Sequence, residues 1–286
     1  MRPLVSIGIP VKIGFSINDE KKIDLLKSLD PILNQTYNNL EIIISNNFSD
    51  NKTRDYLKKV AENDKRIRLF DQKNELSWAE NFKFVLDNST GDYFKWNAAD
   101  DIISTDFVEK NINFLENNKD FVSSSSKFYY EDKPNNVNFF NLEDKLYLRI
   151  KNFFKYRHIS HNILYSLIRK EILKETIDIS KDYWAVDWIF NLDLLLNGKF
   201  KTLDQGYVIY GTKGISRKKD FIDRKVYSNK NIYRILPYYE LMKNLFLKTL
   251  FLKNLSIFEK ISIYFTSVKI NYHFFKQKFK KKHRNS

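Results

Sequence analysis

Two adjacent carboxylates, Asp100 and Asp101, follow an apolar and aromatic run in the stretch GDYFKWNAADDIIS, residues 91–104. Two negative charges side by side repel each other unless a cation lies between them or water screens them. The pair is therefore either solvated at a turn or bound to a cation. Paired acids in loops are commonly turn or cap residues, so the elements around the pair must decide between the two interpretations.

The other side chains of the chain limit which metal such a site takes. The 286 residues include no Cys and only four His. This composition excludes disulfides, thiolate catalysis and Cys-based zinc or iron–sulfur sites, and it agrees with a reducing cytoplasm. A metal here would have oxygen ligands, which favour magnesium, manganese or calcium.

Short β-branched runs divide the first hundred residues, and segments with helical spacing separate them. The runs predict strands at residues 4–10, 40–45, 67–70 and 92–96. Continuous apolar strands that alternate with amphipathic helices predict a mainly parallel sheet covered by helices on both faces. Ligands of such sheets bind beyond the carboxyl ends of the strands.

Two polar loops follow strands of this predicted sheet. SNNFSDN, residues 45–51, comes after the second strand, and NAADD, residues 97–101, comes after the fourth. Both loops are expected to open at the same edge of the sheet as Pro10. The carboxylate pair is therefore expected at the ligand-binding rim.

The strand and helix alternation is less regular in the middle of the chain. Its pattern predicts a helix at 104–117, a loop at 133–145, a strand running into a helix at 161–173, and a helix at 187–200 that Gly198 ends. The expected division is a first part at residues 1–104, a second at 105–217 and a C-terminal extension at 218–286.

The C-terminal extension is rich in Lys, Tyr, Phe and Leu. Seven apolar side chains fall at helical spacing, namely Ile257, Ile261, Tyr264, Phe265, Val268, Tyr272 and Phe275. An aromatic-rich helix face beside a cationic run is typical of an interfacial membrane helix, although basic runs are also often disordered tails. No stretch approaches the ~20 uninterrupted apolar residues of a membrane span.

The formal net charge of +14 calls for a polyanionic partner or surface. Nucleic acid, anionic lipid and a phosphorylated substrate are the candidates. The positive excess is heaviest after residue 216, and the carboxylate loops would repel the phosphates of a nucleic acid. We therefore expect an anionic membrane surface rather than nucleic acid, with the protein peripheral at the cytoplasmic, inner face of the cell membrane.

The usual glycine-rich phosphate cradles are absent. The chain has neither a G-x-G-x-x-G turn nor a G-x-x-x-x-G-K-[ST] loop, and it has only seven Gly. A nucleotide would have to be held another way. A divalent cation bound by aspartates at a strand end neutralises a diphosphate and stabilises it as a leaving group.

Three segments carry a resemblance to a known family. LVSIGIP, LNQTYNNLEIIISNNFSDN and YFKWNAADDIIS, in this order and spacing, resemble the nucleotide-binding half of family 2 glycosyltransferases with the GT-A fold. The resemblance covers about residues 4–118, and residues 155–216 more loosely. It implies an α/β fold of the GT-A type, a nucleotide-sugar donor with UDP as the first choice, Mn or Mg as cofactor, and a glycan or lipid-linked acceptor.

The resemblance also implies roles for the two rim loops. Asp100 would face the ribose and diphosphate, and Asp101 would coordinate Mg or Mn. The implied nucleotide-binding residues are Pro10, Val11, Asn46, Asn47, Asp50 and Asp100. Asp50 is almost equally well placed to cap the helix that follows it, and one residue can do both.

The segment YWAVDWIFNLDLLLNGKF resembles the family region that carries the catalytic base, which makes Asp187 the candidate. The flanking Trp184 and Trp188 are expected to raise its basicity by desolvation. The base would take a proton from an acceptor hydroxyl, and the implied outcome is inversion at the anomeric carbon. An ordinary acid at a helix start is the rival interpretation.

Three further residues are candidate ligand contacts, and two alternative functions are open. His161, Trp184 and Arg217 are candidate contacts to the acceptor or the diphosphate, although a lone His is more often structural and loop cations are commonly solvated. A nucleic-acid-binding protein is one alternative. A GT-A-like binding protein without catalysis is another, because Asn46, Ala98 and Val186 differ from residues that the family commonly carries.

Overall fold

Aliphatic side chains build the first strands of the sheet. Every residue of β1 (Val5–Val11) and β2 (Leu40–Asn46) is buried. A strand buried on both faces needs helices on both sides, and the chain supplies them between successive strands. The structure, a computed structural model, describes residues 2–12, 19–174, 176, 178–181, 184–212 and 236–282.

One mixed sheet runs through the described part of the chain, in the order β3-β2-β1-β4-β8-β6-β9-β5, with β7 beside β6. The further strands are β3 (Ile67–Asp71), β4 (Tyr93–Trp96), β5 (Ile102–Ile103), β6 (Phe121–Tyr130), β7 (Lys133–Asn138), β8 (Leu167–Arg169) and β9 (Lys199–Tyr210). The helices are α1 (Asp19–Leu33), α2 (Asn51–Asn63), α3 (Trp78–Asp87), α4 (Phe107–Asn117), α5 (Leu146–Tyr156), η1 (Arg157–Ile159), α6 (His161–Leu164), α7 (Lys170–Leu173), α8 (Val186–Asn197), α11 (Tyr239–Leu250) and α12 (Ile257–Lys282).

The parallel sheet predicted for the first hundred residues is confirmed. β1 pairs in parallel with both β2 and β4, and β2 pairs in parallel with β3. In this register Val11 lies opposite Asn46, and Asn46 lies opposite Asp71. The carboxyl ends of β1, β2 and β3 therefore meet at one edge of the sheet, as expected.

Strands from the second half of the chain extend the same sheet with antiparallel pairings. β8 lies between β4 and β6 and is antiparallel to both. β9 is parallel to β6 and antiparallel to β5, the short strand that follows the carboxylate pair. This pairing brings the end of β9 against the loop that carries Asp100 and Asp101.

The loop predicted at 133–145 is wrong in its first part. Residues Lys133–Asn138 form β7, which pairs antiparallel with the edge of β6. Its side chains are mostly exposed, so no alternation of apolar and polar residues marks it in the sequence. Backbone hydrogen bonds to β6 form this strand without an apolar face.

An aromatic cluster connects the sheet to α8. Trp96 is fully buried at the end of β4, and its Nε1 donates a hydrogen bond of 2.9 Å to the carbonyl of Phe82. Its ring packs edge-on against Phe94 and against Phe190 of α8, with centroids 4.7 and 5.5 Å apart. The cluster fixes the position of α8 relative to the rim. As predicted, this helix ends at Gly198.

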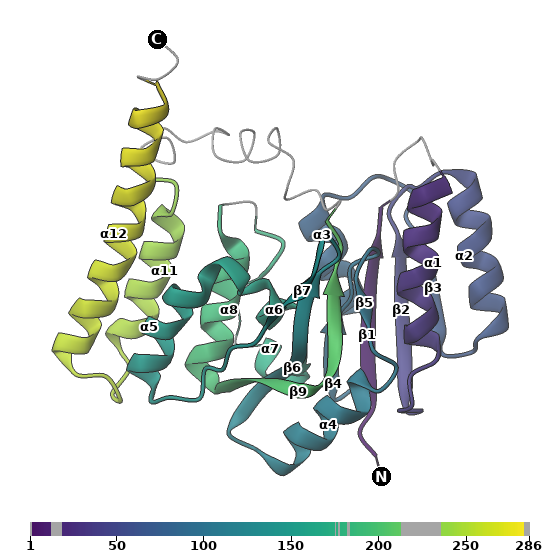
Figure 1. Cartoon of the computed structure of the whole chain (residues 1–286), viewed down its shortest axis with the longest axis horizontal. Helices are drawn as coiled ribbons and strands as arrows, with labels where there is room; N and C mark the ends of the chain where they lie inside the picture. Colours follow the sequence, from purple (N-terminus) through teal and green to yellow (C-terminus); the bar gives the residue numbers. More distant parts are fainter. Residues whose placement is uncertain are drawn as a thin grey trace.

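The helical extension predicted for the end of the chain is confirmed by α11 and α12, which pack together at one end of the molecule, while α1 and α2 lie at the other (Figure 1). α12 turns Ile263, Ser267 and Asn271 inward, and the backbone N–H of Tyr238 donates to Oδ1 of Asn271 at 2.9 Å. No helix in the described ranges has the length and apolarity that crossing a bilayer requires.

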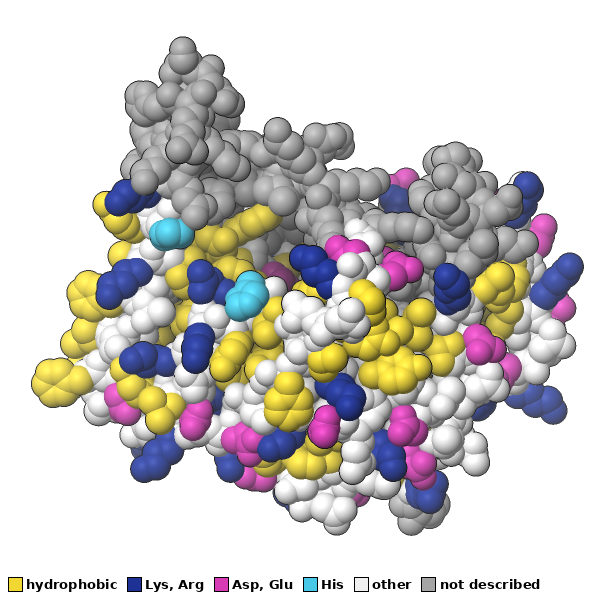
Figure 2. Space-filling model, viewed as in Figure 1, with side chains coloured by type: hydrophobic (Ala, Val, Ile, Leu, Met, Phe, Trp, Pro, Cys, Tyr) yellow, Lys and Arg dark blue, Asp and Glu magenta, His cyan; other side chains and the backbone are white. Residues whose placement is uncertain are grey.

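The aromatic stripe predicted on α12 faces solvent. Its exposed members are Ile257, Ile261, Tyr264, Phe265 and Tyr272. Phe258 beside them is 80% exposed, and Phe265 is 57% exposed. Figure 2 shows hydrophobic side chains along the left edge of the molecule, at the α12 end, with Lys and Arg among them. The stripe is therefore a surface and not part of the core.

Candidate active site

The loop after β4 is fixed from within by Asn97. Its buried side-chain amide donates to the backbone carbonyls of Ala98 at 3.0 Å and Asp101 at 2.9 Å. It also donates to the hydroxyl of Ser28 on α1 at 3.2 Å. These bonds hold the turn that carries the carboxylate pair in one conformation before any ligand arrives.

Asp101 lies deep in the rim, and Asp100 is half-buried beside it. Asp101 is only 5% exposed, and its Oδ1 accepts a hydrogen bond of 3.0 Å from the backbone N–H of Gly211. Burial, followed by the neighbouring charge of Asp100, raises the pKa of Asp101 to about 8. The ionised form of Asp101 is therefore disfavoured, and a cation beside the pair would favour it.

Lys95 is a buried cation that sequence reasoning missed. It is 1% exposed, and its Nζ donates to the carbonyls of Trp96 at 3.0 Å and Tyr165 at 2.7 Å. Burial lowers the pKa of Lys95 to about 7, and the charge of Asp101 acts in the opposite direction. A Lys inside a fully buried strand was the available signal, because a charged side chain is rarely buried without a partner.

The donor set at the rim fits a hard divalent cation. Asp100 and Asp101 supply carboxylate oxygens, the ligands that magnesium and manganese prefer. Within the described residues, no group of three or more His, Cys, Asp or Glu side chains gathers to hold a metal. Magnesium at phosphate-transfer sites commonly takes one or two carboxylates and completes its shell with substrate phosphates and water. The rim offers such a partial shell.

The loop after β2 contributes the second wall of the rim. The amide of Asn46 donates to Oδ1 of Asp71 at 2.7 Å, and its Oδ1 is buried with no hydrogen-bond partner among the described residues. Asn47 holds the loop before α3, since its side chain bonds both the N–H and the carbonyl of Leu76, at 2.7 and 2.8 Å. Phe48 has a left-handed backbone with φ 55°.

The remaining residues predicted around the nucleotide build the loop itself. Pro10 and Val11 are buried at the end of β1, and the carbonyl of Val11 accepts a hydrogen bond of 2.8 Å from the backbone N–H of Asn47. Asp50 caps α2, because its Oδ1 accepts from the backbone N–H of Thr53 at 2.8 Å. The capping alternative for Asp50 is therefore present in the structure.

Asp187 occupies the first turn of α8 and is half-buried. The helix begins after Ala185, whose φ of 62° places a non-glycine residue in the left-handed region. Backbone strain of this kind costs about 1–3 kcal/mol and clusters at functional sites. The second such residue among those described is Phe48, in the other polar loop of the rim.

Tyr165 lies within electrostatic reach of all three acids. Burial raises the pKa of its hydroxyl well above the usual value, and the charges of Asp101, Asp100 and Asp187 raise it further, in that order. All three carboxylates therefore lie within electrostatic reach of one phenol. The tertiary structure brings together a pair from the end of β4 and an acid from α8 that are 86 residues apart in the chain.

Comparison with known proteins identifies the chain. The sequence profile described as Glycosyl transferase family 2 matches residues 18–177, which is more than half of the chain. This protein belongs to glycosyltransferase family 2. The family resemblance drawn from the sequence is confirmed.

Curated relatives agree with this assignment, and solved structures share the fold. An uncharacterised glycosyltransferase of Haemophilus influenzae is 36% identical over 124 residues, which cover 43% of this chain and 36% of the relative's own length. TarS 1–349 of S. aureus in complex with UDP-GlcNAc superposes with a TM-score of 0.66 at 13% identity, covering 91% of this chain and 70% of the TarS 1–349 chain.

A mannosyltransferase of Pyrobaculum calidifontis, solved with GDP-Man and Mn²⁺, gives a TM-score of 0.54 at 13% identity, over 93% of this chain and 69% of the other. At such identities the likeness concerns the fold alone. It confirms the expected GT-A type of α/β fold for this family 2 glycosyltransferase.

In this glycosyltransferase, His161 lies in an aromatic group beside the rim. Its Nε2 is 3.3 Å from the hydroxyl of Tyr130, and its ring packs edge-on to Tyr210 with centroids 4.4 Å apart. The hydroxyl of Tyr210 donates to Oδ1 of Asn162 at 2.8 Å, and the charge of Asp101 reaches Tyr210. The structure thus places His161 near the rim, in contact with tyrosines.

Trp184 and Trp188, the two tryptophans that flank Asp187, both pack against Tyr238 in the C-terminal part of the chain. The ring of Trp188 stacks on Tyr238 with centroids 5.3 Å apart, and Trp184 lies edge-on at 6.4 Å. Tyr238 was not singled out from the sequence. The candidate Arg217 lies outside the described residues.

Proposed function

We propose that this glycosyltransferase moves a sugar from a nucleoside-diphosphate sugar to a hydroxyl of a cell-surface glycan or lipid-linked acceptor, with Mn or Mg as cofactor and with inversion at the anomeric carbon. The observation that carries the proposal is the arrangement of the acid pair in the loop after β4 and of Asp187 in the first turn of α8, all within electrostatic reach of Tyr165. A metal-binding acid pair and a separate carboxylate base are the parts that such a displacement requires.

The donor is proposed to lie along the rim formed by the loops after β1, β2 and β4. UDP is the first choice of nucleotide, since the structural relative TarS binds UDP-GlcNAc. Asn46 brings a carbonyl oxygen that has no partner among the described residues and suits an N–H donor of the base. Asn47 and Asp50 shape the pocket through the bonds that fix its loop.

Asp101 is the proposed metal ligand, and Asp100 faces the ribose and diphosphate. Bound there, the metal would neutralise the charge that develops on the departing diphosphate. Two hydrogen bonds hold Asp101 in place. The backbone N–H of Gly211 donates to its carboxylate, and the side-chain amide of Asn97 donates to its backbone carbonyl.

Asp187 is the proposed base. Its position in the first turn of α8 stabilises a negative charge, because the helix dipole is positive at that end. The carboxylate takes the proton of the acceptor hydroxyl while that oxygen forms its bond to the anomeric carbon and the bond to the diphosphate breaks. Attack from the side opposite the leaving group inverts that carbon.

Three successive segments of the chain are proposed to have separate roles. Residues 1–104 are proposed to bind the donor, residues 105–217 the acceptor and the base, and residues 218–286 to associate with the membrane. The exposed stripe of α12 supports the last part, since large exposed apolar patches mark interaction surfaces. With a net charge of +14, the chain suits the anionic cytoplasmic face of the cell membrane.

Calorimetry with UDP in the presence of Mn tests the proposal. Wild type is expected to bind, and Asp101→Ala is expected to lose most of the Mn-dependent affinity and the hydrolysis of a UDP-sugar. Asp132→Ala, on an exposed turn, removes the same charge away from the rim and serves as the control. If UDP binds equally well to both variants with and without Mn, the assignment of Asp101 is wrong.

A further inference from the structure

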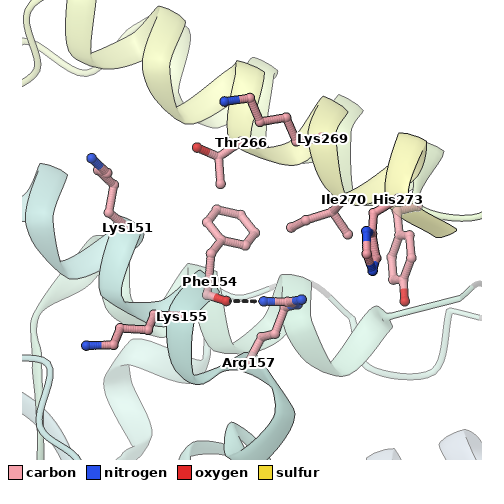
Figure 3. Close-up of a pocket in the computed structure, with 9 residues that line it drawn as sticks. Lys151, Phe154, Lys155, Arg157, Thr266, Lys269, Ile270 and His273 are labelled. Atoms are coloured by element: carbon pink, nitrogen blue, oxygen red, sulfur yellow. Dashed lines mark hydrogen bonds between the residues drawn. The ribbon is translucent and has the colours of Figure 1, made fainter. Parts of the chain in front are cut away.

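A cleft of about 600 Å³ opens between α5 and α12, away from the rim. The residues that line it are Lys151, Phe154, Lys155, Arg157, Tyr238, Thr266, Lys269, Ile270 and His273. Four of them are permanent cations, and none of these described lining residues is acidic. In Figure 3, Phe154 and Ile270 point into the space between the two helices.

Local contacts position three of the four cations that line this space. Nη1 of Arg157 donates to the carbonyl of Phe154 at 2.6 Å, which fixes the half-buried guanidinium at the base of the cleft (Figure 3). The ammonium groups of Lys151 and Lys155 lie over the rings of neighbouring tyrosines, each 5.2 Å from the ring centroid. Like charges gathered at one cleft repel each other, and an anion that enters relieves this repulsion.

Tyr238 connects the cleft to the proposed base. It lines the cleft, and its ring also stacks on Trp188, the residue next to Asp187. Burial raises the pKa of Tyr238, and the charges of Arg157 and Asp187 act on it in opposite directions. One side chain is therefore within electrostatic reach of both the cationic cleft and the carboxylate that would accept the acceptor's proton.

We propose that this cleft binds a phosphate group of the acceptor, as a phosphodiester or a diphosphate, and so presents an acceptor hydroxyl to Asp187; the inference rests on the proposed function. Arg pairs with phosphate through two parallel hydrogen bonds, and Lys adds point charges. A diphosphate carries more than one negative charge and would neutralise more of the four cations than a single carboxylate. The volume accommodates a phosphate together with the unit attached to it.

The cleft is separate from the proposed membrane surface. At roughly 100° per residue, Thr266, Ile270 and His273 lie on the side of α12 opposite the exposed stripe around Ile261 and Phe265. Binding of a phosphate in the cleft and insertion of the stripe into a bilayer are therefore distinguishable by substitution.

Inorganic pyrophosphate, titrated into the full chain in the presence of EDTA, is the probe. With EDTA present, no metal can bridge pyrophosphate to the rim acids, so the loss of binding on substitution of the cleft lysines reports the cleft. Wild type is expected to bind pyrophosphate. The double variant Lys155→Ala with Lys269→Ala is expected to lose at least about tenfold in affinity. No binding by wild type overturns the proposal.

The matched control is Lys58→Ala with Lys59→Ala, which removes the same charge from an exposed part of α2. Its affinity for pyrophosphate is expected to equal that of wild type. An equal loss in both double variants would show a general charge effect and overturn the proposal. All four lysines are exposed, so neither double variant is expected to impair folding.

Two parallel measurements separate the remaining interpretations. The cleft variant is expected to keep its binding to phosphatidylglycerol vesicles and its Mn-dependent affinity for UDP. Release from the vesicles, with pyrophosphate binding unchanged, would make the cleft residues a lipid head-group site and overturn the proposal. If wild type does not bind UDP, the proposed function is contradicted. The pyrophosphate titration then still decides whether the cleft binds phosphate.

Discussion

The backbone N–H of Gly211 donates a 3.0 Å hydrogen bond to Oδ1 of Asp101, a residue 110 positions earlier in the chain. The end of β9 is thus the support of the carboxylate pair. A Cβ at position 211 would meet Oδ2 of Asp100 at 2.5 Å and its backbone oxygen at 2.8 Å. The close approach requires a residue without a side chain.

Gly211→Ala is therefore expected to displace the acid pair. Mn-dependent UDP binding should fall by about tenfold or more, because the proposed ligand set no longer holds its position. Tyr207→Ala, at an exposed position on β9, the strand that precedes Gly211, serves as the control. Calorimetry measures the affinity and urea unfolding the stability. Unchanged UDP affinity in Gly211→Ala would contradict the role given to this contact.

Asp187→Asn is expected to separate chemistry from donor binding. Loss of a general base costs about 10²–10⁴-fold in rate, while the isosteric amide leaves the donor rim intact. Transfer should fall by that factor, and UDP affinity should stay within about twofold. Asp204→Asn, a side chain that is 87% exposed, is the matched control. Full transfer activity in Asp187→Asn would exclude this residue as the base.

Glu41 is expected to make stability depend on acidic pH. Its Oε1 accepts hydrogen bonds from Ser6 Oγ at 2.6 Å, from the backbone N–H of Gly91 at 3.1 Å, and from that of Thr90. Burial opposes ionisation, but these hydrogen bonds outweigh it and hold the pKa of the carboxyl below its usual value. The network joins β1, β2 and the turn before β4.

A depressed carboxyl pKa contributes stability above the unfolded pKa of about 4.3, and this stability is lost as pH falls through the folded pKa. Glu41→Gln should lower the free energy of unfolding by about 1–3 kcal/mol at neutral pH. The difference from wild type should shrink as the pH falls below about 4. Urea unfolding across this range measures it, and a difference that is constant with pH would contradict the linkage.

The exposed stripe of α12 is expected to bind anionic vesicles. Burying one Phe side chain contributes about 1.5–3 kcal/mol, so Phe258→Ser and Phe265→Ser together should weaken binding by at least about a hundredfold. Val137→Ser with Phe139→Ser changes two exposed apolar residues elsewhere and should have no effect. Co-sedimentation with phosphatidylglycerol vesicles measures binding. Equal retention of both double variants would contradict the role of the stripe in binding to the vesicles.

Local patterns were enough to predict much of the fold. Runs such as LVSIGIP and LEIIIS predicted buried parallel strands, and Gly198 predicted the end of α8, because strand and helix periods are properties of neighbouring residues. The rule that ligands bind at the carboxyl ends of parallel strands then located Asp100 and Asp101 at the rim. Family resemblance, rather than periodicity, singled out Asp187.

Only the tertiary structure decided which distant groups surround these acids. Tyr165 and Gly211 come near the pair because β8 pairs with β4 and β9 pairs with β5, and no local period encodes such pairings. The stripe on α12 has the same spacing whether it faces a core or solvent, and packing of the opposite face decided that it is exposed. Sequence thus determined which residues share an element, whereas long-range packing determined their neighbours.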